Sequence, residues 1–195
     1  MIDKRKQIKT GELSLTKNQV VKLLDSIDVF EHKVFFELAV NLGLRRGDIV
    51  CLKWRDVDFD KQILSFFEHK KSRVRHVPLS PHIVQLLKML KHQSSNSYYI
   101  FSGGSDRKYG FGHLSERSAY NYFQMYLVKA GIQKASDRRP FHCLRATCIK
   151  LCQQAGFTVE QAAKHIGDTV RVVQEHYATP SDEEMREVVC GKKLF

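Results

Sequence analysis

The sequence predicts a mainly α-helical protein with a small β-hairpin or three-stranded sheet, an α+β fold in one domain. Three observations support this prediction. The chain has 195 residues and is 43% apolar, which is enough for one well-buried core. Helix start and stop signals recur along its length. Only residues 62–80 alternate in the manner of paired strands.

Two helices are expected before residue 43. Thr16 and Gln19 form a capping box ahead of the segment VVKLLDSI, which is typical of a helix start. Apolar residues within 34–42 line one helical face, and Gly43 then stops the helix. Residues 47–60 predict a short helix that ends in an acidic turn.

The central segment predicts a hairpin followed by a helix. Residues 62–80 are rich in β-branched and aromatic residues on both sides of the polar turn HKKS, so Lys70 and Lys71 are expected at the hairpin tip. Ser80 followed by Pro81 is a typical N-cap with proline at the first helical position.

Four more helices are expected in the C-terminal half. The first begins at Ser115 and ends at Gly131, and the second lies within residues 141–156. The third helix begins with a second capping box, at Thr158. Asp168 is placed to cap the last helix, TVRVVQEHY.

The charge balance favours a polyanionic partner. Lysine and arginine outnumber the acids 32 to 21, which gives a net charge of +11. In a chain this rich in aromatic residues, that excess favours a folded protein that binds nucleic acid rather than membrane, although charge alone also fits a basic protein without such a partner. No segment has the h-region of a signal peptide or the ~20 apolar residues of a membrane span. We therefore expect a cytoplasmic, nucleoid-associated protein.

The cysteines predict neither a disulfide framework nor a metal site. Five is an odd number, and no CxxC pair occurs. Three of the cysteines stand near His142 and could suggest zinc, but buried thiols within a helix are the commoner case. The five are Cys51, Cys143, Cys148, Cys152 and Cys190.

Polar side chains mark four places where the chain turns: GLRRGD, HKKSR, HCLR and HY. The planar fork of arginine binds a phosphate through two parallel hydrogen bonds, so Arg45 and Arg145 suit one phosphate. The alternative is that these arginines pair with carboxylates such as Asp48. His142 could bind a phosphate oxygen or transfer a proton. Tyr177, with an ordinary pKa near 10, needs a base or a neighbouring positive charge to act as a nucleophile.

Together, these segments resemble the catalytic domain of the tyrosine recombinases, the phage integrase family, over residues 16–180. The segment GLRRGDIVCLKWRDVD resembles the family's Gly-Leu-Arg box, and HKKSRVRHVPLS resembles its lysine-bearing hairpin. PFHCLRATCIKLCQQAG is similar to the His-x-x-Arg box, and HIGDTVRVVQEHYATP to the terminal box. The catalytic residues implied by the resemblance are Arg45, Lys70 (with Lys71 as the alternative), His142, Arg145 and the nucleophile Tyr177. Further DNA contacts are expected from Arg46, Lys71, Arg73, Arg75 and Arg139.

The resemblance implies a site-specific recombinase that needs no metal, ATP or other cofactor. Tyr177 would attack a phosphodiester of double-stranded DNA, leaving a 3'-phosphotyrosyl bond and a free 5'-hydroxyl. The two arginines would bind the non-bridging oxygens, Lys70 would protonate the leaving oxygen, and His142 would act as acid or base. The expected assembly is a homotetramer on DNA, in a phage or other mobile element. The alternatives are a type IB topoisomerase or a DNA-binding regulator derived from a recombinase.

The sequence departs from the family at Asp168. The family usually has histidine, sometimes tryptophan, directly after the glycine of the terminal box. A carboxylate beside a phosphate would repel it and would lack the donor. We therefore expect Asp168 to turn away, either to cap the helix that begins at Thr169 or to pair with Arg171. His165 is a possible substitute donor.

The second departure is length. Only a basic segment, residues 1–15, precedes the catalytic match, so the usual N-terminal domain of about 80 to 100 residues is expected to be absent. The chain is then either a minimal recombinase or a catalytic-domain fragment. The tail, residues 181–195, is expected either to dock on a neighbouring protomer or to fold back as a short helix.

Overall fold

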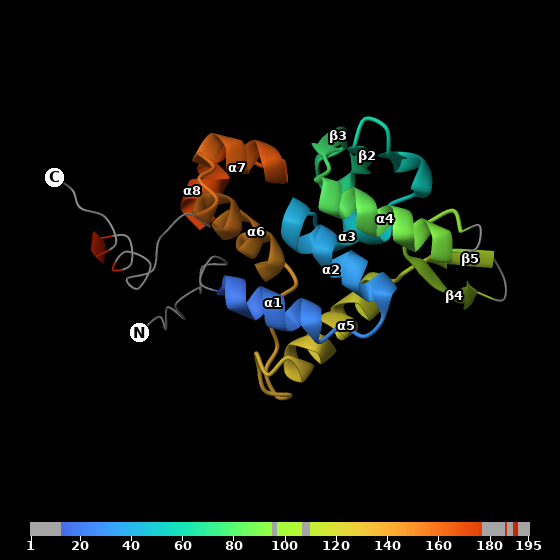
Figure 1. The fold of residues 1–195 in the computed structure, drawn as a ribbon, viewed down its shortest axis with the longest axis horizontal. Coiled ribbons are helices and arrows are strands. Elements are labelled where there is room, and N and C mark those ends of the chain that lie inside the picture. The colour runs from blue at the N-terminus through green and yellow to red at the C-terminus, as the bar shows by residue number, and fades with distance from the viewer. Residues whose placement is uncertain (1–12, 95–96, 107–109, 177–185, 187–188, 191–195) are drawn as a thin grey trace, which may run out of the picture.

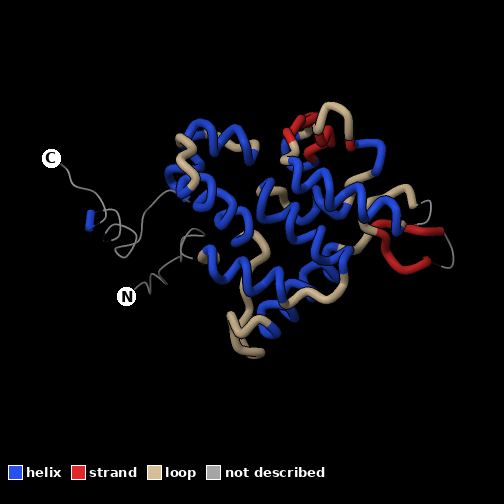
Figure 2. The backbone as a smooth tube through the Cα atoms, in the orientation of Figure 1, coloured by secondary structure: helices blue, strands red, loops and turns tan. Residues whose placement is uncertain are grey.

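The computed structural model describes residues 13–94, 97–106, 110–176, 186 and 189–190. Within this part of the chain, the helices form most of the structure and a small antiparallel sheet lies beside them (Figures 1 and 2). This confirms the predicted fold class. The α-helices of the described residues up to His176 are α1 (Lys17–Asp25), α2 (Phe30–Leu42), α3 (Arg46–Val50), α4 (Pro81–Gln93), α5 (Glu116–Lys129), α6 (Cys143–Gln154), α7 (Val159–Ile166) and α8 (Val170–His176).

Helix α2 is the centre of the helical layer and packs against α1, α3, α4 and α6 (Figure 1). All of residues 34–40 are buried, including the carboxylate-bearing Glu37. A helix that is apolar on nearly every face must be covered on all sides, which explains why its neighbours surround it. Gly43 ends α2 with a positive φ of 58°, and Arg45 follows at the start of α3.

The three-stranded sheet has the order β1-β2-β3, with both pairs antiparallel. Its strands are β1 (Val57–Asp58), β2 (Ile63–Glu68) and β3 (Arg73–Pro78). A 3-10 turn, η3 (His69–Lys71), joins β2 to β3 and is closed by Ser72 with a φ of 47°. The predicted hairpin is therefore confirmed, with Lys70 and Lys71 in its turn.

A second hairpin was not expected from the sequence. It consists of β4 (Ser102–Asp106) and β5 (Gly110–His113). Its segments are rich in glycine and lack the alternation of apolar residues that reveals a strand. The hairpin is held from its base, where the Leu114 amide donates to the Phe101 carbonyl at 2.9 Å.

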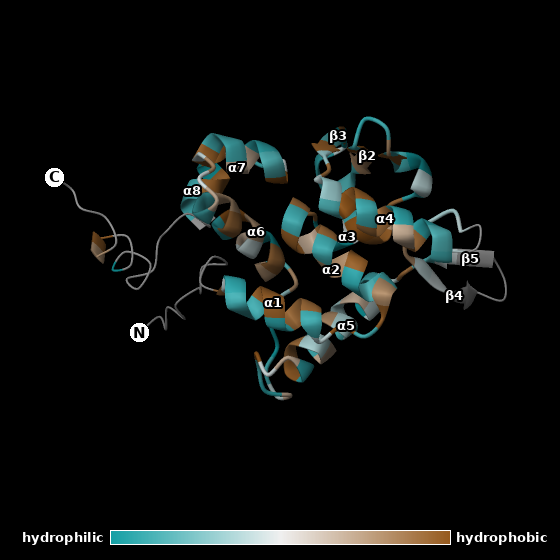
Figure 3. Cartoon of the chain, viewed as in Figure 1, coloured by the Kyte–Doolittle hydropathy of each residue, from teal (hydrophilic) through white to brown (hydrophobic). Residues whose placement is uncertain are grey.

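The apolar residues form two clusters. The larger unites α1 to α5 with the sheet, whereas the smaller lies among α6, α7 and α8 and includes Cys148, Ile166 and Val173. Figure 3 shows segments of apolar and polar residues alternating along the ribbons of α4 and α7, in keeping with one buried and one solvated face on each. Among the described residues, no helix combines the length and the apolar content needed to cross a membrane.

The capping boxes predicted at Thr16 and Thr158 are both formed. The cap predicted at Asp168 is wrong. Thr169 caps α8 instead, since its Oγ1 accepts from the Val172 amide at 3.2 Å. The Asp168 carboxylate is engaged elsewhere, in the site described next.

Candidate active site

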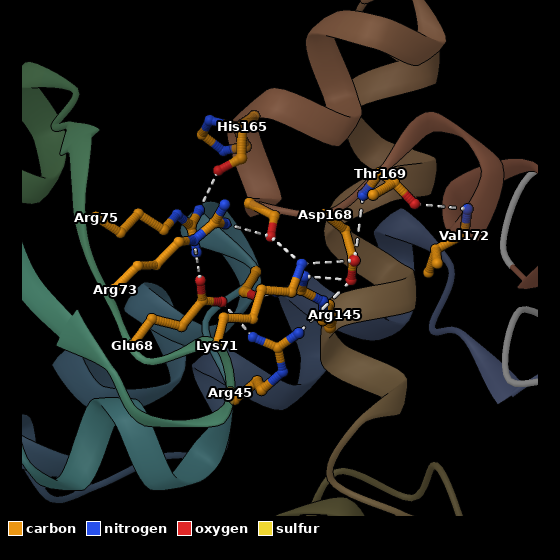
Figure 4. Close-up of polar contacts among 12 residues, drawn as sticks. Arg45, Glu68, Lys71, Arg73, Arg75, Arg145, His165, Asp168, Thr169 and Val172 are labelled. Carbon is orange, nitrogen blue, oxygen red and sulfur yellow. Dashed lines mark hydrogen bonds and ion pairs between the residues drawn. The ribbon is translucent and has the colours of Figure 1, made fainter.

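Four segments far apart in the sequence meet at one place in the structure. They are the start of α3, the β2–β3 turn, the start of α6 and the α7–α8 turn (Figure 4). These segments carry Arg45, Lys70 and Lys71, His142 and Arg145, and Asp168. The structure thus brings together the described residues that the sequence singled out as catalytic.

Arg45 is held by a carboxylate that the sequence analysis missed. Glu68, at the end of β2, has a side chain with no exposed surface and forms ion pairs with Arg45 Nη1 and, at 2.9 Å, with Arg73 Nε. Burial acts to raise the pKa of Glu68, but the hydrogen bonds from Arg73 and Arg45 outweigh it and lower the pKa. An acidic residue directly before the basic turn HKKSR was the signal that could have identified it.

Arg145 is the most deeply buried cation of the site, with a side chain only 1% exposed. Its Nη1 donates to the Gly43 carbonyl at 2.6 Å, and its Nη2 donates to Asp168 Oδ2 at 2.8 Å. Its Nε has no hydrogen-bond partner among the described residues. A buried guanidinium requires a counter-charge, and Asp168 supplies it.

Asp168 points into the site, so the expectation that it turns away is wrong (Figure 4). Its Oδ1 accepts from Lys71 Nζ at 2.9 Å, and its Oδ2 also lies 3.6 Å from Arg45 Nη2. The proposed pairing with Arg171 does not form, because Arg171 pairs with Glu175 at 2.7 Å. The inward orientation follows from charge, since three cations outweigh the single backbone amide that a cap would satisfy.

The Asp168 carboxyl remains ionised. Burial opposes ionisation, but hydrogen bonds from Lys71 and Arg145, together with their positive charges, hold the pKa of Asp168 well below its usual range. The α7–α8 turn that carries Asp168 is hydrogen-bonded to the β2–β3 turn and to β3. Gly167 has a φ of 71°, and its carbonyl accepts from Lys71 Nζ at 2.8 Å and from Arg73 Nη2 at 2.9 Å.

A cavity of about 760 Å³ opens beside these groups. Arg45, Lys70 and His142 are among the residues that line it. Burial in this recess and the positive charges of Arg145, Arg45 and Lys70 lower the pKa of His142 to about 4, although the residue as a whole is exposed. His142 is therefore neutral at pH 7 and can accept a proton or donate an N–H hydrogen bond.

The two lysines of the hairpin turn differ in their surroundings. Lys71 is bound to Asp168 and to the Gly167 carbonyl. Lys70 is exposed, lines the cavity and forms no ion pair with any described residue. Of the two, Lys70 is the one whose ammonium group is available to a ligand in the cavity.

A second buried acid fixes the hairpin turn to α3. Asp48 is 4% exposed and accepts a hydrogen bond from the His69 backbone. Burial raises its pKa, against the opposing effect of Arg45. Its Oδ2 has no hydrogen-bond partner among the described residues.

The arginines expected to contact DNA already bind protein groups. Arg46 donates to Glu116 at 3.0 Å, and Arg139 donates to the Leu13 carbonyl at 2.8 Å. Arg75 is 6% exposed and donates to the His165 carbonyl, and burial together with the neighbouring Arg145 lowers its pKa to about 10. Arg75 also packs against the α7–α8 turn, where a Cβ on Gly167 would lie 2.6 Å from its Nε.

His165 does not take the place of the missing histidine. Its Nε2 lies 2.7 Å from the Asn41 carbonyl, and Figure 4 shows its ring directed away from Asp168. The residue contributes to the site through its backbone carbonyl, which accepts from Arg75.

Among the described residues, one group could hold a metal ion. Cys148, Cys152 and His165 each offer a ligand atom, and these atoms all lie within 4.8 Å of one another. This group differs from the one considered on sequence, since His165 replaces Cys143 and His142. Two of its members already bind the Asn41 carbonyl, Cys148 Sγ at 3.5 Å and His165 Nε2 at 2.7 Å.

Tyr177 and most of the tail at 181–195 lie outside the described residues. The last described residue of α8 is His176, one position before the proposed nucleophile.

Comparison with known proteins shows a similarity to tyrosine recombinases and integrases. The tyrosine recombinase XerA of Pyrococcus horikoshii is 24% identical over 183 residues, which cover 93% of this chain and 62% of that protein. A XerA recombinase crystal structure has a TM-score of 0.74 at 20% identity, covering 93% of this chain and 66% of that one. A lambda integrase dimer bound to a COC' core site has a TM-score of 0.68 at 21% identity, covering 85% of this chain and 59% of that one.

The match is to part of these proteins, since the chain spans less than two thirds of the length of the XerA relative. The model of the phage integrase family matches residues 14–184, which is most of the chain. That match includes every box on which the resemblance was based. The chain therefore belongs to the phage integrase family.

Proposed function

We propose that this chain is the catalytic part of a site-specific DNA recombinase that cleaves and rejoins double-stranded DNA through a 3'-phosphotyrosyl intermediate on Tyr177. One observation carries the proposal. A single carboxylate, Asp168, lies within 4 Å of both Arg45 and Arg145, so the two guanidiniums converge on a space the size of one anion. A scissile phosphate has the charge and the oxygen atoms for that space.

In the proposed reaction, the Tyr177 oxygen attacks phosphorus and the bond from phosphorus to the 5'-oxygen breaks. The tyrosine loses its proton and the departing oxygen gains one, so no net proton is consumed. Arg45 and Arg145 would stabilise the charge that builds on the non-bridging oxygens. The reverse attack by a 5'-hydroxyl restores the phosphodiester, and for this reason the proposed chemistry needs neither ATP nor a cofactor.

Two residues that line the cavity, Lys70 and His142, are the proposed groups for the remaining proton transfers. Lys70 is the proposed general acid for the 5'-oxygen, because its ammonium is not held by an ion pair with any described residue. His142 would take part in the reaction as a neutral ring, because its pKa of about 4 leaves it deprotonated at pH 7. It is suited to accept a proton or to bind a phosphate oxygen through an N–H group.

The partners are proposed from the same comparison. The lambda integrase and XerH structures are DNA complexes, one of them a tetramer on a Holliday junction. We propose that this chain likewise acts on double-stranded DNA as a homotetramer. A regulator without cleavage activity is the second candidate, and the carboxylate of Asp168 in a site for an anion is the observation that favours it.

Covalent trapping tests the proposal. The protein is incubated with nicked duplexes from the flanks of its own gene, and the products are separated on denaturing gels. We expect a protein–DNA adduct that Tyr177→Phe abolishes and that Tyr98→Phe, a change at an exposed tyrosine elsewhere, leaves intact. Binding without any adduct would reject the recombinase and favour the regulator.

A further inference from the structure

The Asp168 carboxylate has the contacts that a bound phosphate would have. Lys71 Nζ lies at 2.9 Å, Arg145 Nη2 at 2.8 Å and Arg45 Nη2 at 3.6 Å. The Thr169 backbone amide adds a further donor at 3.2 Å. Guanidinium, ammonium and backbone N–H groups are the donors that proteins use for phosphate oxygens. These four groups are called the anion site below (Figure 4).

We propose that Asp168 is an internal ligand of the anion site, filling it in the free protein, so that a DNA phosphodiester binds only by displacing the carboxylate. The inference rests on the proposed function, because it takes the external ligand to be the phosphate that the two arginines would bind. It adds that the affinity of the site for phosphate is set by competition with a residue of the chain itself.

Burial and charge explain why the free protein needs such a ligand. The Arg145 side chain is 1% exposed, and its only carboxylate partner among the described residues is Asp168. The Glu68 carboxylate is already occupied by Arg45 and Arg73. An unpaired buried guanidinium destabilises a fold, so the carboxylate stabilises the free state. A phosphate would satisfy the same donors, and two anions cannot share them without strong repulsion.

The structure leaves room for the exchange. The Asp168 side chain is 10% exposed, and the cavity beside Arg45 reaches solvent. Hydrogen bonds from Lys71 and Arg73 to the Gly167 carbonyl hold the turn in place, so rotation of the Asp168 side chain can release the donors without moving α7. Protonation does not release it at neutral pH, since its cationic neighbours keep the carboxyl ionised. The displacing agent is therefore another anion.

Phosphate binding to the purified chain tests the proposal. Sodium phosphate is titrated at constant ionic strength with chloride, and binding is followed by thermal shift. Asp168→Asn keeps the shape of the side chain but removes its charge, and we expect it to bind phosphate about tenfold more tightly than the wild type. Asp168→Glu keeps the charge and should bind as weakly as the wild type. Glu175→Gln removes an exposed charge from α8, outside the anion site, and is the matched control.

The opposite result would overturn the inference. If Asp168→Asn binds phosphate no better than the wild type, the carboxylate positions Lys71 and Arg145 and does not compete with the ligand. Should that variant fail to fold, carboxyl carbon NMR of the wild-type protein decides the question. Phosphate should shift the Asp168 carboxyl signal and leave that of Glu68 in place. Phosphate binding without a shift at Asp168 would reject the displacement.

This experiment is independent of DNA cleavage. A gain in phosphate affinity in Asp168→Asn, together with no tyrosine adduct, would reject the recombinase and leave the internal ligand established. An adduct that depends on Tyr177, together with no gain in phosphate affinity, would reject only the internal ligand.

Discussion

Arg145 donates a 2.6 Å hydrogen bond to the carbonyl of Gly43, two positions before Arg45. One arginine of the proposed phosphate-binding pair is thus fixed to the backbone that presents the other. Gly43 makes this possible by leaving α2 with a φ of 58°, a conformation that costs side-chain-bearing residues free energy.

Substitution at Gly43 should disturb both arginines. A Cβ there would lie 2.8 Å from Ile166 Cγ2 and 3.2 Å from Cys148 Sγ. Gly43→Ala should lower the free energy of unfolding by roughly 2 to 4 kcal/mol, from backbone strain and the clash together. Gly131→Ala is the matched control, because its φ is 67° with nothing within 4 Å, and it should cost about 1 kcal/mol. Urea unfolding measures the loss of unfolding free energy in each variant, and equal losses in the two would contradict the predicted clash at Gly43.

Glu68 should be needed to position Arg45. Glu68→Gln removes the charge that Arg45 and Arg73 share, and we expect a loss of about 2 kcal/mol in unfolding free energy. This loss is smaller than the loss expected for a fully buried ion pair, because the Arg73 side chain is 48% exposed. Adduct formation should slow roughly tenfold. Glu116→Gln, which breaks an exposed pair with Arg46, should change the stability far less, and a similar loss in both variants would contradict this role.

His142 should reduce the stability of the protein in mild acid. Its pKa is about 4 in the folded protein and near 6.5 when unfolded, so the unfolded state binds the extra proton. The contribution of His142 to stability is complete above pH 6.5 and is lost as the pH falls toward 4. Proton NMR should place the ring titration near 4, and His142→Gln should flatten this part of the stability profile. A titration near 6.5 would contradict the shift.

Lys70 and Lys71 should differ in the kind of defect that each produces. Lys70→Ala should slow cleavage by about a hundredfold or more through loss of the general acid. A substrate with sulfur at the bridging 5' position should restore its rate, since a thiolate leaves without a proton. Lys71→Ala should not be rescued in this way, because Lys71 is bound to Asp168 and Gly167. Rescue of Lys71→Ala alone would reverse the assignment.

Much of the fold followed from local signals. The capping boxes at Thr16 and Thr158 and the stop at Gly43 rest on contacts within a few residues, which a sequence displays directly. The hairpin β4–β5 could not be predicted from local signals, because its glycine-rich strands lack an apolar pattern. The cap expected at Asp168 did not form, because its carboxylate pairs with cations that lie about 23 to 123 residues away in the chain. A capping rule considers only neighbouring residues and does not include such partners.

The sequence by itself determined the family, the fold class and the candidate catalytic residues, because each is marked by a short segment or by the order of such segments. Only the tertiary structure decided how their charges pair. In the structure, Glu68 pairs with Arg45 and Asp168 pairs with Arg145, whereas Lys70 lines the cavity. Ion pairing depends on distances between segments that are remote in sequence, and spacing along a chain carries no information on those distances.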